Sequence, residues 1–359
     1  MAWTVVLMHV LDLSGYGAGS LAWLKPILAG DAAVNVFIVL SGFVVTHLLL
    51  VRNEPYAPYF ARRAARIIPI YYVCLLLALL VLPAQVQMYT HPWVEYHTIW
   101  ARKFAAFWIR PAQNLMLHLT LLHGVIPDNL LRAGSWAILG PAWSLSLEWQ
   151  FYLVAPALLW LLRAGRAVAV GIVIALLAGS YALHEQSAWR WEWPSFLPLS
   201  IHLFLAGILC RYHFHTLSRW PRWTLPVTGF IAAALLGEYR FELLVWTVFL
   251  TGAVLEARPI EAARGLPALA AKVLARVTRN RLAISLGRCS YSTYLVHIPL
   301  FAAMTWLGAH ALGLSGQGAT AAILLLSLPA LALLSQILYN FIESPFIRLG
   351  ARVNVLATQ

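Results

Sequence analysis

Four ionisable side chains lie inside long apolar runs of this 359-residue chain and could carry chemistry there: His9, Glu148, His297 and Glu343. A titratable group surrounded by membrane hydrocarbon costs several kcal/mol unless another group partners it. Such residues are therefore retained where they pair with one another or line a reaction or transport path. Each of the four is a candidate functional residue.

Glu148 lies in the segment PAWSLSLEWQFYLVAPALL, which also places Ser144, Ser146 and Gln150 in an otherwise lipid-compatible helix. We expect Glu148 to face the protein interior against an Arg, His or Trp partner. Structural ion pairing and a role in a site both remain open from this segment alone.

The other two candidates are close to helix-disturbing features. His297 lies two residues before Pro299, which frees a backbone carbonyl one turn back and can open the helix locally. Glu343, in FIESPF, is interpreted as a carboxylate at the end of the last span, paired with a cytoplasmic arginine.

Three arginines, Arg62, Arg63 and Arg66, cluster in YFARRAARIIPIYY, with Arg62 and Arg66 one helical turn apart. Guanidinium groups pair bidentately with phosphate oxygens, so the cluster suits a phosphate-bearing ligand. Anchoring by positive charge at the cytoplasmic face is the alternative.

Ser41 and Gly42 interrupt the run NVFIVLSGFVV, and helix packing through small residues is one explanation for them.

The composition shows what must position these residues. The chain is 61% apolar and 11% charged with a mean hydropathy of +0.76, whereas soluble domains carry about 25% charged residues. We predict an all-α, polytopic membrane protein, a single domain over residues 1–359, in which about ten transmembrane helices form a compact bundle. The predicted spans are Trp3–Leu13, Ala32–Leu50, Ile67–Leu82, Trp143–Leu162, Ala167–Leu183, Phe196–Tyr212, Thr224–Leu236, Leu243–Leu255, Ile284–Leu307 and Ala319–Phe341.

Basic residues set the predicted orientation, because Lys and Arg are retained on the cytoplasmic side of short loops. A cytoplasmic N-terminus places 18 of the 25 Lys and Arg inside and returns the C-terminus to the cytoplasm. The net charge of +12 is then a topology signal that needs no nucleic acid partner.

The chain has three cysteines, Cys74, Cys210 and Cys289, whose spacing fits neither disulfide pairing nor a set of metal ligands. Neither a disulfide framework nor a metal site is therefore expected.

Two segments need separate interpretation. The first run, Trp3–Leu13, is short of a full span by about seven residues, so we expect the natural reading frame to start upstream of Met1. Between Pro83 and Pro141, Leu115–Val125 is too short to span and is expected to tuck into the bundle. The same external segment holds an aromatic helical face, for which a membrane interface and packing on the bundle are both open. Its residues are Trp93, His97, Trp100, Phe104 and Trp108.

Six motifs in this order strongly resemble the membrane acyltransferase-3 family, bacterial O-acyltransferases that modify surface polysaccharides, lipopolysaccharide, antibiotics and related acceptors. The resemblance covers almost the whole chain. The motifs are VVLMH around His9, FIVLSGF at 37–43, RRAARIIPIYY at 62–72, WSLSLEWQFY at 143–152, YSTYLVHIPL at 291–300 and IESPF at 342–346.

The resemblance implies transfer of an acyl group, commonly acetyl from acetyl-CoA, to a hydroxyl of a sugar or similar acceptor. The family's essential histidine corresponds to His9, its acyl-CoA-binding arginines to Arg62, Arg63 and Arg66, and its embedded glutamate to Glu148. Supporting motif positions are Asn35, Ser41, Gly42, Trp143, Ser144, Tyr294, His297 and Glu343. Asn35 replaces an acidic residue usual in the family, and Trp149 replaces a frequent second one.

These correspondences suggest a mechanism without an acyl-enzyme, in which His9 is the general base that takes a proton from the acceptor hydroxyl. Acyl-CoA would be a co-substrate, with no bound cofactor, and its phosphates would dock on the arginines at the cytoplasmic face of a bacterial inner membrane. The expected partners are the lipid bilayer, acyl-CoA and a carbohydrate or glycoside. A transporter or flippase is the alternative, although no internal repeat supports it.

Overall fold

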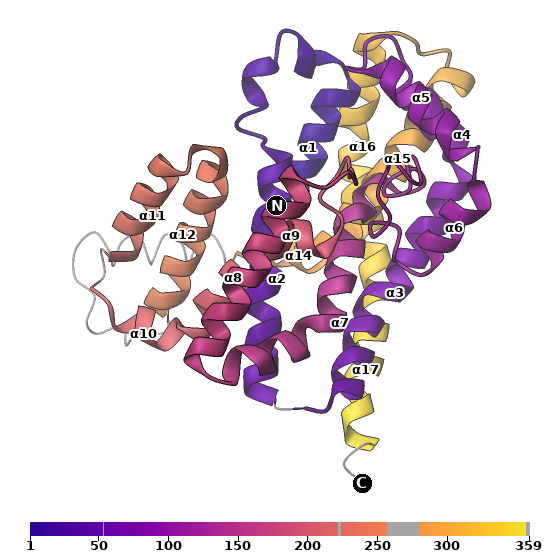
Figure 1. Ribbon diagram of the computed structural model, residues 1–359. Coiled ribbons are helices and arrows are strands. Elements are labelled where there is room, and N and C mark those ends of the chain that lie inside the picture. Colours follow the sequence, from indigo (N-terminus) through magenta and orange to yellow (C-terminus); the bar gives the residue numbers. More distant parts are fainter. Residues whose placement is uncertain (53, 222–223, 257–279, 357–359) are drawn as a thin grey trace.

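A computed structural model describes residues 1–52, 54–221, 224–256 and 280–356 (Figure 1). These residues are mostly helical and contain no strand, which confirms the all-α prediction. The α-helices of the first half of the chain are α1 (Ala2–Leu13), α2 (Gly30–Arg52), α3 (Tyr56–Leu80), α4 (Leu82–Tyr89), α5 (His97–Phe107), α6 (Pro111–Leu119) and α7 (Trp143–Arg163). Those that follow are α8 (Arg166–Glu185), α9 (Leu197–Tyr212), α10 (Phe214–Arg219), α11 (Thr224–Leu235), α12 (Arg240–Glu256), α14 (Arg281–Arg288), α15 (Ser290–Ala311), α16 (Gln317–Leu338) and α17 (Ser344–Leu356).

Five helical stretches of the described chain are long and apolar enough to cross a membrane: Gly30–Arg52, Tyr56–Leu80, Gly140–Arg163, Arg166–Glu185 and Gln317–Arg352. Helices α1, α9 and α11 are apolar but shorter. The protein is therefore a multi-pass membrane protein. The exact number of ten spans stays a prediction.

Two predicted span boundaries were wrong. The run Ile284–Leu307 is not one helix, because α14 ends at Arg288 and α15 begins at Ser290. Helix α14 carries exposed arginines at both ends, so it lies at the surface as a separate element. Glu343 does not end its helix either, since a π-helical turn over Tyr339–Glu343 leads directly into α17. Such turns inside helices often occur at functional sites.

Helices α2 and α9 approach closely because glycines face backbone atoms of the other helix. A Cβ added at Gly42 would lie 2.4 Å from the carbonyl oxygen of Phe204, and one at Gly207 would lie 2.0 Å from that of Val39. No real Cβ fits at these distances. Gly42 is therefore a packing residue that brings α2 against α9.

The aromatic stripe of the external segment packs on the protein only in part. Within α5, the Trp100 ring lies 5.1 Å from that of Tyr89 and 5.0 Å from that of Trp136. Phe104 is also buried. Trp108 follows the end of α5 and is 60% exposed, so the predicted face does not continue to it.

The predicted tucked segment enters the protein at the end of α6 and in the loop that follows. His118, in the last turn of α6, and His123, in the loop, are both fully buried. The hydroxyl of Ser146 donates to the carbonyl oxygen of Leu121 at 2.7 Å and accepts from the backbone N–H of Gly124 at 3.1 Å. Irregular backbone at this depth is tolerated because α7 satisfies its polar groups.

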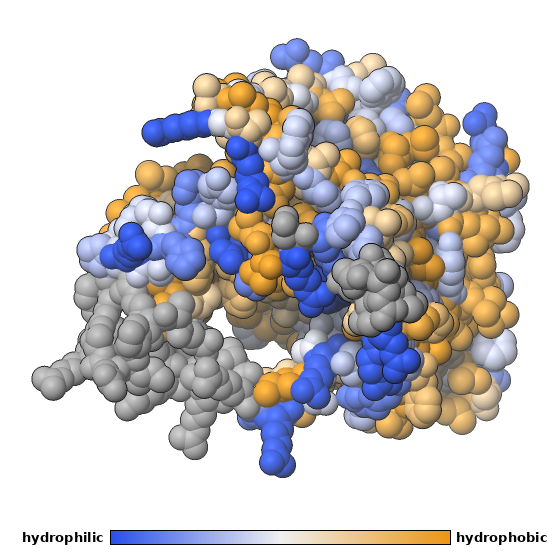
Figure 2. Space-filling model, turned by 90° about the horizontal axis from the view of Figure 1, so that it is seen from below, coloured by the Kyte–Doolittle hydropathy of each residue, from blue (hydrophilic) through white to orange (hydrophobic). Residues whose placement is uncertain are grey.

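The end of the bundle at which α2 leads into α3 carries hydrophilic side chains. Seen from this end, they gather between apolar flanks (Figure 2). Exposed Arg52 belongs to this end, at the last turn of α2. The opposite end holds α4 and α5 (Figure 1).

Candidate active site

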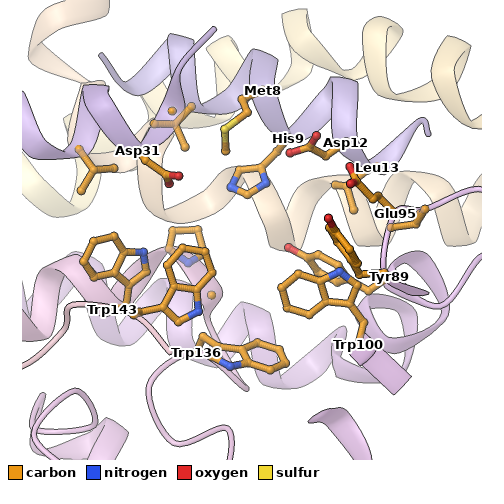
Figure 3. A pocket seen from close by; sticks show the side chains of 18 of the residues that line it. Met8, His9, Asp12, Leu13, Asp31, Tyr89, Glu95, Trp100, Trp136 and Trp143 are labelled. Atoms are coloured by element: carbon orange, nitrogen blue, oxygen red, sulfur yellow. The ribbon is translucent and has the colours of Figure 1, made fainter. Parts of the chain in front are cut away.

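His9 lies at a cavity of about 240 Å³ near the end of the bundle that carries α4 and α5. We call it the His9 cavity. The residue comes from α1, and α2 continues the same wall, while the opposite wall is aromatic. Figure 3 shows Met8, His9, Asp12 and Asp31 on one side and Tyr89, Trp100, Trp136 and Trp143 on the other.

Arg66 lines a second cavity, of about 400 Å³, between α1, α2, α3, α7 and α15. We call it the Arg66 cavity. Most of its wall is apolar, and its polar side chains are Arg66, Ser144, Ser290, Tyr291 and Tyr294. The Arg66 side chain is solvent-accessible although it lies among these helices, because it projects into the cavity. A guanidinium placed in this way is available to an anionic ligand.

The two cavities adjoin each other. Val5, Val34 and Tyr294 line both of them. The hydroxyl groups of Tyr294 and Ser144 lie 2.9 Å apart and share a hydrogen bond, which fixes the tyrosine at the boundary. Groups bound in the two cavities would therefore meet beside Tyr294.

Glu148 belongs to the Arg66 side of this boundary. Its carboxylate accepts hydrogen bonds from Ser41, at 3.2 Å, and from the hydroxyl of Tyr152. Arg66 is close enough to interact electrostatically with both Glu148 and Glu343. Glu148 makes no hydrogen bond or ion pair with His9, and both residues lie in the described part of the chain. The charged neighbours of Glu148 are thus arginines, Arg66 foremost, and not His9.

Glu343 is buried and accepts a hydrogen bond from Ser292 at 2.8 Å. Its charged neighbour is Arg66 of α3. The π-helical turn that carries Glu343 thus supplies the second carboxylate beside Arg66. Glu148 and Glu343 are both buried, and a buried carboxylate needs such a cationic neighbour.

His9 has a second imidazole beside it. The ring centroids of His9 and His297 lie 5.3 Å apart. His297 is fully buried, and neither of its ring nitrogens has a hydrogen-bond partner. Helix α15 continues through Pro299 and packs against α1, and its part before the proline carries both Tyr294 and His297.

The arginine cluster separates into three environments. Arg62 is buried and forms an ion pair with Glu54. The guanidinium of Arg63 lies over the ring of Tyr152, 5.4 Å from its centroid. Of the three, only Arg66 lines one of the two cavities described above.

The α7 motif presents two faces. Trp143 lines the His9 cavity and Ser144 the Arg66 cavity, and Glu148 follows Ser144 one turn later. Ser146 and Gln150 point elsewhere: Gln150 donates to the carbonyl oxygen of Ser195 at 2.9 Å and accepts from the N–H of Leu197 at 2.9 Å. These two residues hold the tucked segment and the start of α9.

Asn35 donates from its side-chain amide to Glu242 of α12 at 2.9 Å. It is therefore not part of either cavity wall. Asp31, one turn earlier on α2, has an accessible carboxylate in the His9 cavity. Asp31 and Asp12 were not predicted as site residues from the sequence, although the three-residue spacing of His9 and Asp12 was a signal that both face the same side of α1.

Lys25 lies outside the spans, in the lining of the His9 cavity, and forms ion pairs with two carboxylates of that lining. Its Nζ lies 2.5 Å from Glu95 and 3.5 Å from Asp12. The hydrogen bond from Lys25 holds the pKa of Glu95 below its ordinary value, and that bond also raises the pKa of Lys25. Among the described residues, no group of three His, Cys, Asp or Glu side chains is arranged to hold a metal ion.

The fold and site define a multi-pass helical membrane protein in which an imidazole and a guanidinium occupy adjoining cavities. Residues 2–339 match the acyltransferase domain of the acyltransferase-3 family. The chain belongs to this family and is an acyltransferase, which confirms the resemblance drawn from the sequence motifs.

Two relatives were found among characterised proteins. The acyltransferase MdmB of Streptomyces mycarofaciens is 26% identical over 356 residues, which cover 92% of this chain and 84% of that protein. Nodulation protein 10 of Rhizobium leguminosarum bv. viciae is 24% identical over 225 residues, which cover 58% of each. No solved structure matches the chain.

Proposed function

We propose that this acyltransferase moves an acyl group, most simply acetyl, from acyl-CoA to a hydroxyl of a sugar or glycoside acceptor. The observation that carries the proposal is the pair of adjoining cavities, with Arg66 in one and His9 in the other. Two substrates that enter from opposite ends of such a pair would bring their reacting groups together beside Tyr294.

Acyl-CoA takes the Arg66 cavity in this proposal. The guanidinium of Arg66 would pair with a CoA phosphate, and Glu148 and Glu343 would keep that guanidinium in place. The apolar remainder of the wall suits the less polar pantetheine arm. The arm would carry the thioester toward Tyr294 and the His9 cavity.

The acceptor takes the His9 cavity. Its hydroxyl oxygen attacks the thioester carbonyl carbon while the imidazole of His9 accepts the hydroxyl proton. A new C–O bond forms and the C–S bond breaks, so the acyl group leaves on the acceptor. CoA departs as a thiolate, which the His9 imidazolium can reprotonate. His297, packed beside His9, would fix the orientation of its ring.

The basic residues orient the reaction across the membrane. With both termini in the cytoplasm of a bacterial cell, the end of the bundle at Arg52 faces inward and the end with α4 and α5 faces outward. Cytoplasmic acyl-CoA would then reach Arg66, and an external acceptor would reach His9. The protein would act in the inner membrane on surface glycans or exported glycosides.

Transfer of radiolabelled acetyl from acetyl-CoA in membranes that contain the protein tests the proposal. We expect labelled glycan or glycoside with the wild-type chain, a near-complete loss with His9→Ala, and full labelling with the control His310→Ala. His310 is exposed near the end of α15, outside both cavities. Full labelling by a well-folded His9→Ala protein would refute the role of His9.

A further inference from the structure

The His9 cavity has the walls of a sugar site. Its aromatic wall, formed by Tyr89, Trp100, Trp136 and Trp143, faces His9 and the carboxylates of α1 and α2 (Figure 3). Ring faces of this kind bind the C–H surface of a sugar, and a few polar groups opposite them fix its hydroxyls.

One polar group of the cavity still lacks a protein partner. The carboxylate of Asp31 is accessible and makes no hydrogen bond or ion pair with another described residue. One acceptor is thus left for the hydroxyl groups of a bound molecule.

The charges of the cavity restrict that molecule further. Three carboxylates line it, Asp12, Asp31 and Glu95, against one ammonium group, that of Lys25. The Nζ of Lys25 lies 2.5 Å from Glu95 and 3.5 Å from Asp12, so these two carboxylates already more than balance its charge.

Asp31 is the carboxylate left over, and a further acidic residue reinforces it. Glu242 of α12 is close enough to interact electrostatically with Asp31. The lining of the cavity therefore carries net negative charge. Behind it, Lys103 lies over the rings of Trp100 and Trp136, 4.9 and 5.3 Å from their centroids, but it is not part of the lining and it pairs with Glu192 at 2.6 Å. A like charge on the ligand would be repelled at short range.

We infer that the acceptor of this enzyme is an uncharged or cationic sugar, and that sugars with a carboxylate or phosphate on the reacting ring are excluded. The inference rests on the proposed function, because it assigns the His9 cavity to the acceptor. It adds the charge class of that acceptor.

The test compares acceptors that differ only in charge. The full-length protein in detergent receives radiolabelled acetyl-CoA and a panel of methyl hexosides, each with its matched 6-carboxylate and its matched 6-trimethylammonium derivative. The quaternary nitrogen cannot be acetylated, so only hydroxyl transfer is counted. We expect kcat/KM for neutral and cationic members to exceed that for the carboxylates at least tenfold.

Two variants link the preference to the cavity. Asp31→Asn removes the unmatched carboxylate, so it should reduce the discrimination against the carboxylate sugars several-fold. Glu185→Gln, an exposed change at the end of α8, should leave the discrimination unchanged. Equal effects of the two variants would count against the assignment to Asp31.

The outcomes separate this inference from the proposed function. If the carboxylate sugars react as well as the other acceptors, the inference alone is overturned. The same holds if acetyl-CoA hydrolysis requires His9 but no neutral or cationic sugar of the panel receives label. If neither hydrolysis nor transfer depends on His9, the proposed function fails and the inference fails with it.

Discussion

The substitution Arg66→Lys tests how the donor is held. Lysine keeps a positive charge beside Glu148 and Glu343, so the buried carboxylates stay compensated. It loses the planar fork that pairs with two phosphate oxygens at once. The variant therefore removes a ligand contact without leaving an unpaired buried charge.

The magnitude follows from one lost charge-assisted hydrogen bond. Such a bond contributes about 1.5–3 kcal/mol, and a factor of ten in affinity corresponds to about 1.4 kcal/mol. The KM for acetyl-CoA should rise by about tenfold or more, with a smaller change in kcat, because the contact is made before the chemical step. Initial rates over a range of acetyl-CoA concentrations measure both constants.

Arg62→Lys is the matched control. Arg62 pairs with Glu54 and lies outside the wall of the Arg66 cavity, so its KM for acetyl-CoA should stay close to that of the wild type. Equal increases of KM in the two variants would refute the separation of the arginines. Arg66→Gln should instead lose stability, since it leaves buried Glu343 without its charged neighbour and Glu148 with Arg63 alone.

Three further outcomes are expected. His9→Ala should lower kcat by about 10²–10⁴-fold while acetyl-CoA binding, measured by calorimetry, stays unchanged; loss of donor binding would contradict its place in the acceptor cavity. Gly42→Ala should cost about 1–3 kcal/mol in thermal unfolding in detergent, because its Cβ would meet the Phe204 carbonyl at 2.4 Å, whereas Gly171→Ala, with open space around it, should cost nothing. Asp128 lies outside the spans, and burial raises the pKa of its carboxyl group to about 6. The folded state therefore binds the Asp128 proton more tightly than the unfolded state, and the stability gained in this way is lost as the pH rises from about 4 to about 6. Asp128→Asn should flatten the dependence of Tm on pH in that window, and an unaltered slope would contradict the assignment.

Composition and hydrophobic runs were enough to predict an all-α membrane protein and the place of most helices. They could not predict the break between α14 and α15 or the continuation of α16 through Glu343, because a run of apolar residues reports burial or lipid contact but not helix continuity. The π-helical turn has no signal in the sequence pattern. It is recognised only from backbone hydrogen bonds.

The different contacts of neighbouring residues within one motif were harder to predict. Ser41 and Gly42 are adjacent, yet Ser41 donates to Glu148 and Gly42 contacts α9. The hydrophobic pattern around them does not say which face of α2 meets which helix. The same ambiguity left Arg62, Arg63 and Arg66 as one cluster, although only tertiary contacts decide which guanidinium reaches a cavity.

The α7 motif shows why loss of activity alone would be a poor guide to chemistry here. Ser144 holds Tyr294 at the boundary of the two cavities, and Glu148 faces Arg66. Ser146 and Gln150, two residues further along in each case, instead satisfy backbone groups of the tucked segment and of the start of α9. Substitution of either pair would reduce activity, but for different reasons. A buried backbone group left without its partner costs about 1–3 kcal/mol of stability, so Ser146→Ala should unfold at a lower temperature, whereas a defect confined to Ser144 should appear in the kinetics of a stable protein.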